Sequence, residues 1–201
     1  EVYDPLQAYN RSMYWVNART DDFLLNPAVA GYRRITPGFF RRGVTNFFEN
    51  LDDIPTLLNQ VLQLKWRGAW DTSRRVVTNS TLGLAGLIDV ADRWQITRHD
   101  EDFGQTLGHY GVHRGPYIML PLFGPSTLRD AIGRGVDLLA MGWVDPVQLD
   151  HHPHRRYPYY PLLVVDTRAN TAFQYFETGS PFEYELVRLL WVTTRRMDVA
   201  K

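Results

Sequence analysis

Hydrophobic residues recur at helical spacing in three parts of this chain. The three series begin after Asp4, Asp53 and Ser180, and within each series the apolar side chains share one face of a helix. They are Leu6, Tyr9, Met13 and Val16; Ile54, Leu57, Leu58, Val61 and Leu62; and Phe182, Leu186, Leu189 and Leu190. This spacing predicts three amphipathic helices.

Helix starts are marked where a capping residue precedes proline, at Asp4-Pro5, Thr36-Pro37 and Ser180-Pro181. The first and last have the residues of a capping box, because Gln7 and Glu183 follow three positions later. Thr127 with Asp130 offers a further cap of this kind. We expect additional helices at about 66–79, 85–93, 126–142 and 160–178.

Strand signals are weak throughout the sequence. No segment alternates apolar and polar residues over a sustained length, and no hairpin dipeptide separates two β-branched runs. The sequence therefore predicts an all-α fold.

One uncharged stretch interrupts this helical pattern, GPYIMLPLFGPSTL from Gly115 to Leu128. Pro121 removes a backbone donor in its middle, and Gly–Pro pairs stand near both ends. These features predict an apolar loop. A loop this apolar must be covered by protein, face a partner or meet lipid, because exposed loops are usually polar.

Several predicted helices have more apolar surface than a single core-facing stripe needs. The additional residues are Tyr14, Trp15, Phe39, Phe40, Phe47, Phe48, Trp191 and Val192. A tightly packed core is the more frequent explanation of such an excess. The alternative is an outer face in lipid, where Trp and Tyr favour the headgroup level.

Length and composition narrow the class of protein. The 201 residues contain no linker or shift in composition, so we expect one domain over residues 1–201. The net charge is zero, which argues against nucleic-acid binding. No apolar run is long enough for a spanning helix, the first residues do not form a signal peptide, and cysteine is absent.

Arginine dominates the positive charge and occurs in doublets. A phosphate-bearing partner would suit arginine, but solvated or ion-paired arginines are the commoner case and are favoured here. The doublets are Arg33-Arg34, Arg41-Arg42, Arg74-Arg75, Arg155-Arg156 and Arg195-Arg196.

Motifs for catalysis or metal binding are not convincing. The glycines of GHYGVHRG match no phosphate loop, and Ser126 lies outside a nucleophile elbow. The carboxylates of residues 100–102 are expected to form a solvated turn or a cap, and the histidines of residues 151–154 a solvated connection, with a zinc site as the less favoured alternative. We expect no enzyme activity, no cofactor and no metal.

Taken together, five segments resemble the MlaA/VacJ family of outer-membrane lipoproteins, which help to maintain lipid asymmetry in Gram-negative bacteria. The matching segments are DPLQAYNRSMY, GVTNFFENLDD, TNSTLGLAGLIDVA, DFGQTLGHYGVHRGPYIMLPLFGPSTLRD and DTRAN. They extend over nearly the whole length, with glycines and prolines in place, so the resemblance is specific.

The resemblance implies a ring-like arrangement of amphipathic helices around a central amphipathic channel, embedded in the inner, periplasmic leaflet of the outer membrane. Such a protein would remove mislocalised phospholipid from the outer leaflet and pass it to the periplasmic carrier MlaC, beside a trimeric porin. The uncharged stretch would then line the lipid path. The residues expected there are Tyr117, Ile118, Met119, Leu120, Leu122 and Phe123.

This sequence also departs from the family pattern. The lipid-bearing N-terminal cysteine is absent, so we expect the anchor to have been removed. The segment from Trp143 to Pro161 does not align, and the sequence stops at Lys201 without the family's polar tail. A soluble lipid- or fatty-acid-binding module and a lipid hydrolase stay open as alternatives.

Overall fold

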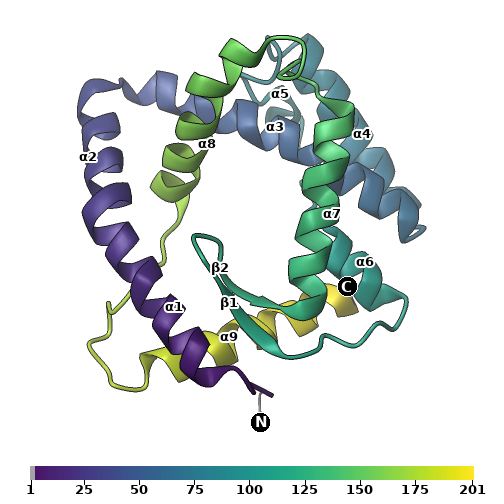
Figure 1. The fold of residues 1–201 in the computed structure, drawn as a ribbon. Coiled ribbons are helices and arrows are strands. Elements are labelled where there is room, and N and C mark those ends of the chain that lie inside the picture. The colour runs from purple at the N-terminus through teal and green to yellow at the C-terminus, as the bar shows by residue number, and fades with distance from the viewer. Residues whose placement is uncertain (1–2) are drawn as a thin grey trace. The chain divides into compact units, whose positions relative to one another are not determined.

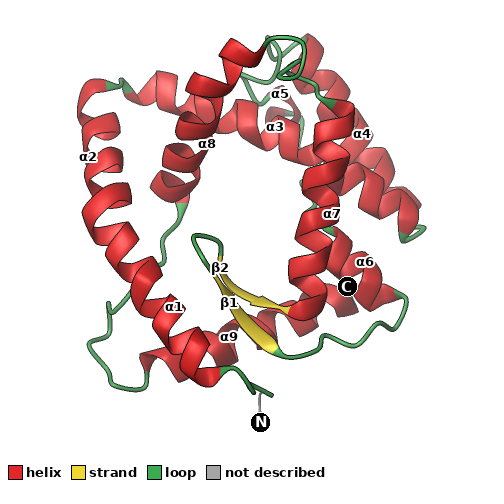
Figure 2. Cartoon of the chain, viewed as in Figure 1, coloured by secondary structure: helices red, strands yellow, loops and turns green. Residues whose placement is uncertain are grey.

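The computed structural model describes residues 3–201, and helices dominate it (Figures 1 and 2). The α-helices are α1 (Gln7–Thr20), α2 (Asn26–Ile35), α3 (Gly38–Leu62), α4 (Trp66–Thr81), α5 (Val90–Arg93), α6 (Phe103–His109), α7 (Leu128–Val144), α8 (Arg156–Asn170) and α9 (Glu183–Ala200). A π-helical turn (Asp21–Leu25) joins α1 to α2, and a 3₁₀ turn (Pro153–Arg155) precedes α8. The predicted all-α class is confirmed, apart from the small hairpin of β1 (Tyr117–Leu120) and β2 (Gly124–Thr127).

Contacts between residues divide the described chain into two compact units. Unit 1 contains the segments up to Pro27, from Phe103 to Val136 and from Ala172 onwards, whereas unit 2 contains Ala28–Asp102 and Asp137–Thr171. The expectation of one domain over residues 1–201 stays a prediction.

The hairpin of unit 1 lies within the stretch predicted to be a loop, so that prediction is wrong for β1 and β2. Pro125 is tolerated in β2 because it pairs with Met119, whose N–H points away from β2 and donates to the side chain of Asn10. Pairing of the two strands therefore needs no backbone N–H at position 125, so proline is compatible with it. Pro121 lies in the turn between the strands.

Aromatic side chains form the apolar core of unit 1. Tyr14 of α1 and Tyr184 of α9 pack edge to face with ring centroids 6.0 Å apart, and Tyr117 and Met119 of β1 complete the cluster with Val192. This arrangement joins helices and a strand that are far apart in the sequence.

Unit 2 has an apolar cluster and a buried polar network. Val44, Phe48 and Leu51 of α3 pack against residues of α8, which lies alongside α3 in Figure 1. Between α3 and α4, Arg75 is 2.9 Å from Asp89 and 3.4 Å from Asp53. The guanidinium thus compensates two carboxylates that would otherwise be costly to bury.

Burial acts differently on these two carboxyl groups. It raises the pKa of Asp53 to about 6, although Arg75 opposes the shift. Burial would also raise the pKa of Asp89, but hydrogen bonds from the Asp92 N–H, Arg75 and Asn79 lower it below its ordinary value.

The apolar faces predicted from the sequence point outward. On α1 the buried residues are Asn10, Tyr14, Asn17 and Ala18, whereas Tyr9 and Val16 of the predicted stripe are exposed. In α3 and α9 most residues of the predicted stripes are exposed as well, although both helices bury apolar side chains beside polar ones. The exposed stripe residues are Leu6, Tyr9, Val16, Leu58, Val61, Leu62, Phe182, Leu186, Leu189 and Leu190. Met13 and Ile54 of the same stripes pack against the apolar cores. A core-facing interpretation is therefore wrong for the exposed residues only.

Predicted helix positions are confirmed to different degrees. The segment 66–79 corresponds to α4, and 126–142 corresponds to α7 except that its first two residues belong to β2. The prediction for 160–178 is wrong beyond Asn170, and only the last four residues of 85–93 are helical. Leu84, Ala85 and Gly86 have positive φ values, which a helix does not allow. Helices α2 and α6 were not predicted.

One predicted cap is confirmed and two capping boxes are not. Thr127 accepts from the Asp130 N–H at 3.3 Å, and its hydroxyl donates to the Asp130 carboxylate. Asp4 and Glu183 instead bind residues distant in the sequence, so α1 and α9 begin without the predicted reciprocal bonds. No helix among residues 3–201 is both long and apolar enough to cross a membrane.

The close approach of α7 to α6 gives a test of packing in unit 1. A Cβ at Gly133 would lie 2.3 Å from the Gly104 nitrogen, whereas nothing lies within 4 Å of one at Gly135. We expect Gly133→Ala to lower the free energy of unfolding by about 1–3 kcal/mol through overpacking. Gly135→Ala should leave it unchanged or raise it by up to about 1 kcal/mol, because alanine favours helices. Thermal unfolding of both variants in detergent measures this difference, and equal midpoints would contradict the packing.

Candidate functional site

Two asparagine side chains of α1 hold the free edge of β1. Asn10 donates to the Tyr117 carbonyl at 3.1 Å and accepts from the Met119 N–H at 2.8 Å. Asn17, two helical turns later, donates to the Leu120 carbonyl at 2.9 Å and accepts from the Leu122 N–H at 2.8 Å. Each amide thus replaces a neighbouring strand by satisfying one donor and one acceptor of the backbone.

A buried carboxylate positions Asn10. The Asp4 side chain is only 2% exposed and accepts from Arg188 at 2.7 Å. It also accepts from Asn10 at 2.7 Å and from the Tyr184 hydroxyl at 2.6 Å. The network therefore fixes α1, α9 and the hairpin to one another within unit 1.

A second carboxylate, Glu183, joins α1 to the segment before α9. It accepts from the Tyr14 hydroxyl at 2.5 Å, from the Thr178 N–H at 2.9 Å and from the Phe176 N–H. Burial would raise the pKa of Glu183, but hydrogen bonds from Thr178 and Tyr14 lower it. Glu183 is therefore a structural anion at neutral pH.

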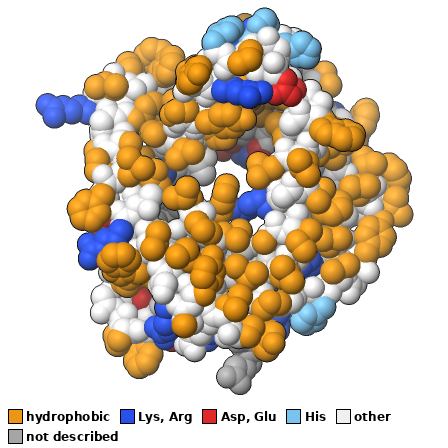
Figure 3. Space-filling model, viewed as in Figure 1, with side chains coloured by type: hydrophobic (Ala, Val, Ile, Leu, Met, Phe, Trp, Pro, Cys, Tyr) orange, Lys and Arg blue, Asp and Glu red, His pale blue; other side chains and the backbone are white. Residues whose placement is uncertain are grey.

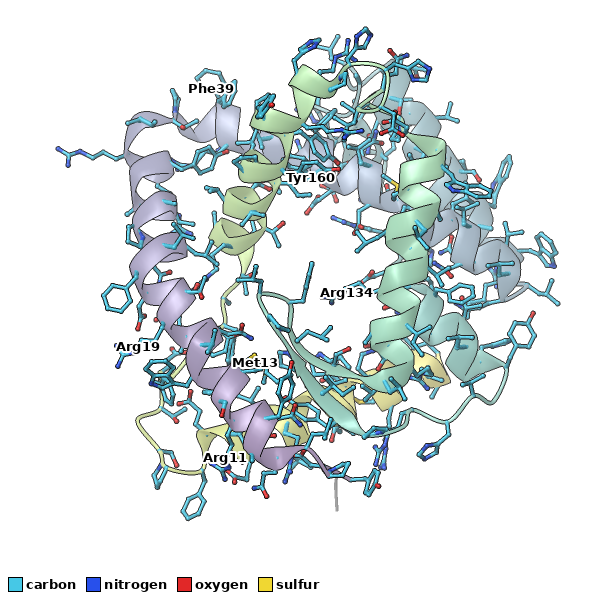
Figure 4. The ribbon with its side chains drawn as sticks, in the orientation of Figure 1. Arg11, Met13, Arg19, Phe39, Arg134 and Tyr160 are labelled. Carbon is cyan, nitrogen blue, oxygen red and sulfur yellow. The ribbon has the colours of Figure 1, made fainter. Side chains whose placement is uncertain are left out.

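The turn of the hairpin presents apolar side chains at the surface. Leu122 adopts φ +65° and is 68% exposed, and Phe123 is 57% exposed. The Arg134 guanidinium of α7 lies 5.1 Å from the centre of the Phe123 ring, and Figure 4 labels its side chain. The Arg134 guanidinium therefore makes a cation–π contact with the exposed Phe123 ring of the turn.

The six residues predicted for a lipid path separate into three groups. Tyr117 and Met119 are 1% and 0% exposed and belong to the core of unit 1, so they pack the hairpin against α1 and α9. Ile118 and Leu120 are half-buried on the opposite face of β1. Leu122 and Phe123 are exposed at the turn.

Exposed hydrophobic side chains extend well beyond the hairpin. Figure 3 shows them over much of the face that it presents. In unit 2, Trp66, Trp70 and Val77 are more than half exposed along α4. In unit 1, Leu189 and Leu190 of α9 and Phe182 directly before it are similarly exposed. Apolar area on this scale marks an interaction surface rather than scattered surface residues.

Unit 2 also contains a polar cavity of about 400 Å³. Its lining includes Tyr32, Thr45, Asp166 and Asn170. Burial raises the pKa of Asp166, although hydrogen bonds from Thr45 and Asn170 oppose the shift. These partners give Asp166 a structural role between α3 and α8.

The other groups considered for chemistry have ordinary partners. Glu101 accepts from Gln63 and Lys65, and Asp150 pairs with Arg156 beside the histidines of residues 151–154. Within residues 3–201, no three His, Cys, Asp or Glu side chains are grouped so that they could hold a metal ion.

The roles of Asn10 and Asn17 were missed by sequence reasoning. A signal was present, because the two asparagines are seven positions apart and fall on one helical face with Tyr14. Their partners lie more than 100 positions away and could not be identified from the sequence.

Comparison with known proteins identifies relatives of the same kind. The family model described as "MlaA lipoprotein" matches residues 2–198. Proteins named "Intermembrane phospholipid transport system lipoprotein MlaA" are 37% identical in Shigella flexneri (70% of this chain, 59% of the relative) and 38% identical in Escherichia coli strain K12 (67% and 55%). An uncharacterised protein of Rickettsia conorii is 38% identical over 65% of this chain and 52% of its own length.

The structural comparison extends over the whole fold. A solved structure described as "Structural basis for maintenance of bacterial outer membrane lipid asymmetry" matches with a TM-score of 0.78 and 29% identity, over 98% of both chains. The chain spans about half the length of the curated relatives that it matches.

These features define a class of helical protein that buries hydrogen-bonded polar networks beside small apolar cores and exposes many large apolar side chains. The chain belongs to the MlaA lipoprotein family, as its sequence matches the family over nearly its whole length. The resemblance stated from the sequence is therefore confirmed.

The asparagine contacts predict how the turn of the hairpin is held. We expect Asn17→Leu to speed hydrogen exchange of the Leu122 amide by at least about fivefold, because the variant removes the acceptor of this amide and a hydrogen bond contributes about 1 kcal/mol. The Met119 amide, held by Asn10, should stay protected. Amide exchange measured by NMR in detergent tests this, with Ser12→Ala on α1 as control. Unchanged exchange at Leu122 would contradict the assigned role of Asn17.

Proposed function

We propose that this protein is the outer-membrane component of a phospholipid transport system that maintains lipid asymmetry. It removes mislocalised phospholipid from the outer leaflet and passes it to a periplasmic carrier. The family match over residues 2–198 and the names of the Shigella and Escherichia relatives support this proposal. So does the likeness to a structure concerned with outer-membrane lipid asymmetry.

The single observation that supports a membrane location best is that polar side chains are buried on helices whose apolar stripes are largely exposed. Asn10, Asp53, Asn59 and Glu183 are at most 3% exposed, whereas most residues of the apolar series on the same helices are exposed. Helices that lie in a membrane interface present leucine and aromatic faces to acyl chains. Polar contacts between helices then provide attraction that the hydrophobic effect does not provide in lipid.

The proposed lipid path follows the outer side of the hairpin. Because Tyr117 and Met119 pack the core, the proposal for lipid contact narrows to Ile118, Leu120, Leu122 and Phe123. In the turn, the Leu122 N–H donates to Asn17, and the Phe123 carbonyl accepts from Arg134. Because these backbone groups have partners, an irregular turn is compatible with an apolar environment. The ring-like arrangement around an amphipathic channel stays a prediction.

The partners follow from the same proposal. They are phospholipid, the outer membrane, a trimeric porin and the carrier MlaC, with the protein anchored by lipid in the periplasmic leaflet. We expect transport without catalysis and without a cofactor or metal. The carboxylates Asp4, Asp89 and Glu183 support this expectation, because each is engaged by several donors in a structural network.

A charge placed on the hairpin tests the lipid path. We expect Leu120→Asp and Phe123→Asp to fold, reach the outer membrane and lose most of their ability to restore lipid asymmetry in cells that lack the endogenous protein. Phe123 gives the clearer test of the two. A carboxylate at this exposed position costs little free energy of folding, but it opposes the passage of acyl chains. Surface-accessible phospholipid and thermal stability in detergent are the two measurements.

The matched control is Val112→Asp, at a 45% exposed apolar residue of a loop in the same unit. It should restore asymmetry fully. If either hairpin variant is folded, correctly localised and fully active, that residue is not on the path. If both fail to fold, the residues belong to the core and their assignment to the path is overturned.

A further inference from the structure

Four arginines surround a small cavity in unit 1. The cavity has a volume of about 130 Å³ and is lined by Arg114, Arg129, Arg195 and Arg196, with Thr127, Asp130, Val192 and Val199. Arg114 precedes the hairpin, Arg129 begins α7, and the Arg195-Arg196 doublet belongs to α9. Asp130 is the only carboxylate in this lining.

Asp130 is already occupied by other donors. One of its carboxylate oxygens accepts from Arg129 and from Arg195, each at 3.0 Å, and the other accepts from the Thr127 hydroxyl at 2.6 Å. A single carboxylate therefore compensates two of the four guanidinium groups. The lining retains a surplus of positive charge in a partly enclosed space.

Arg114 and Arg196 provide that surplus. In the described part of the chain, no ion pair joins either residue to a carboxylate. One terminal nitrogen of Arg114, Nη1, is buried without a hydrogen-bond partner. A buried guanidinium nitrogen without a protein acceptor is costly, so an anionic ligand that accepts from this nitrogen would be favoured.

The backbone at the start of α7 does not provide the missing interactions. The N–H groups of Leu128, Arg129 and Asp130 already donate to Pro116, Arg114 and Thr127. Recognition in the cavity must therefore come from the guanidinium groups. Their forked donors fit the oxygens of a tetrahedral phosphate group.

We propose that this cavity is a binding site for a phosphate group, held by Arg114 and Arg196 and bordered by Arg129 and Arg195. The group is either that of a phospholipid headgroup or free phosphate, which present the same oxygens. This site does not depend on the proposed transport function, because its geometry and charge lie within unit 1.

Binding to the purified protein in detergent tests the site by calorimetry. The ligands are inorganic phosphate, dihexanoyl phosphatidylglycerol and, as a lipid without phosphate, dihexanoylglycerol, all at constant ionic strength. We expect Arg114→Gln and Arg196→Gln each to weaken phosphate-dependent binding at least about tenfold. Arg19→Gln should not weaken it, because Arg19 is an exposed arginine of the same unit, labelled in Figure 4, that contacts aromatic rings away from the cavity.

Each outcome decides the proposal. Arginine-dependent binding of phosphatidylglycerol alone assigns the site to a headgroup, and arginine-dependent binding of inorganic phosphate alone assigns it to the free ion. Absence of binding of both phosphate-bearing ligands, or binding unchanged in Arg196→Gln, overturns the proposal even if Arg114→Gln fails to fold. A protein that restores lipid asymmetry without binding phosphate would overturn this site and leave the transport function intact.

Discussion

Hydrogen bonds between buried polar groups hold each unit of this protein together. In unit 1, Asn10 and Asn17 satisfy the edge of β1, and Asp4 holds Asn10 in place. In unit 2, Arg75 and Asn79 converge on Asp89. Such networks stabilise a fold when every member has partners, and the cost of losing one member is correspondingly high. Because polar side chains share the interior with two small apolar cores, many apolar side chains of the helices lie on the exterior.

Sequence patterns predicted the helices better than they predicted the interior. The periodicity located much of α1 and α9 and the second half of α3, the expected ranges located α4 and most of α7, and the Thr127–Asp130 cap is confirmed. Periodicity identifies an apolar face but does not tell whether protein or lipid covers it. The sequence alone therefore allowed either a protein or a lipid environment for these faces. The exposure of Leu58, Leu189 and their neighbours argues against a covering of protein within the described residues.

The hairpin and its support could not be derived in the same way. Four-residue strands with prolines between and within them give almost no alternating signal, and Asn10 meets β1 across 107 positions of sequence. The sequence singled out this segment as the candidate lipid path, which stays a prediction, but it did not distinguish the two faces of the hairpin. Tyr117 and Met119 turn inward, while Leu122 and Phe123 are exposed where Asn17 holds the turn.

The central claim is that the outward apolar faces of the helices meet acyl chains. Tryptophan fluorescence tests it directly in protein reconstituted into phospholipid vesicles, with a variant that keeps only Trp70 of α4, a 66% exposed residue, and a control that keeps only Trp191, which packs against the core of unit 1. The account predicts that lipids brominated in their acyl chains quench Trp70 strongly and Trp191 weakly, while aqueous iodide hardly quenches Trp70. Strong quenching of Trp70 by iodide with none by brominated lipid would contradict it.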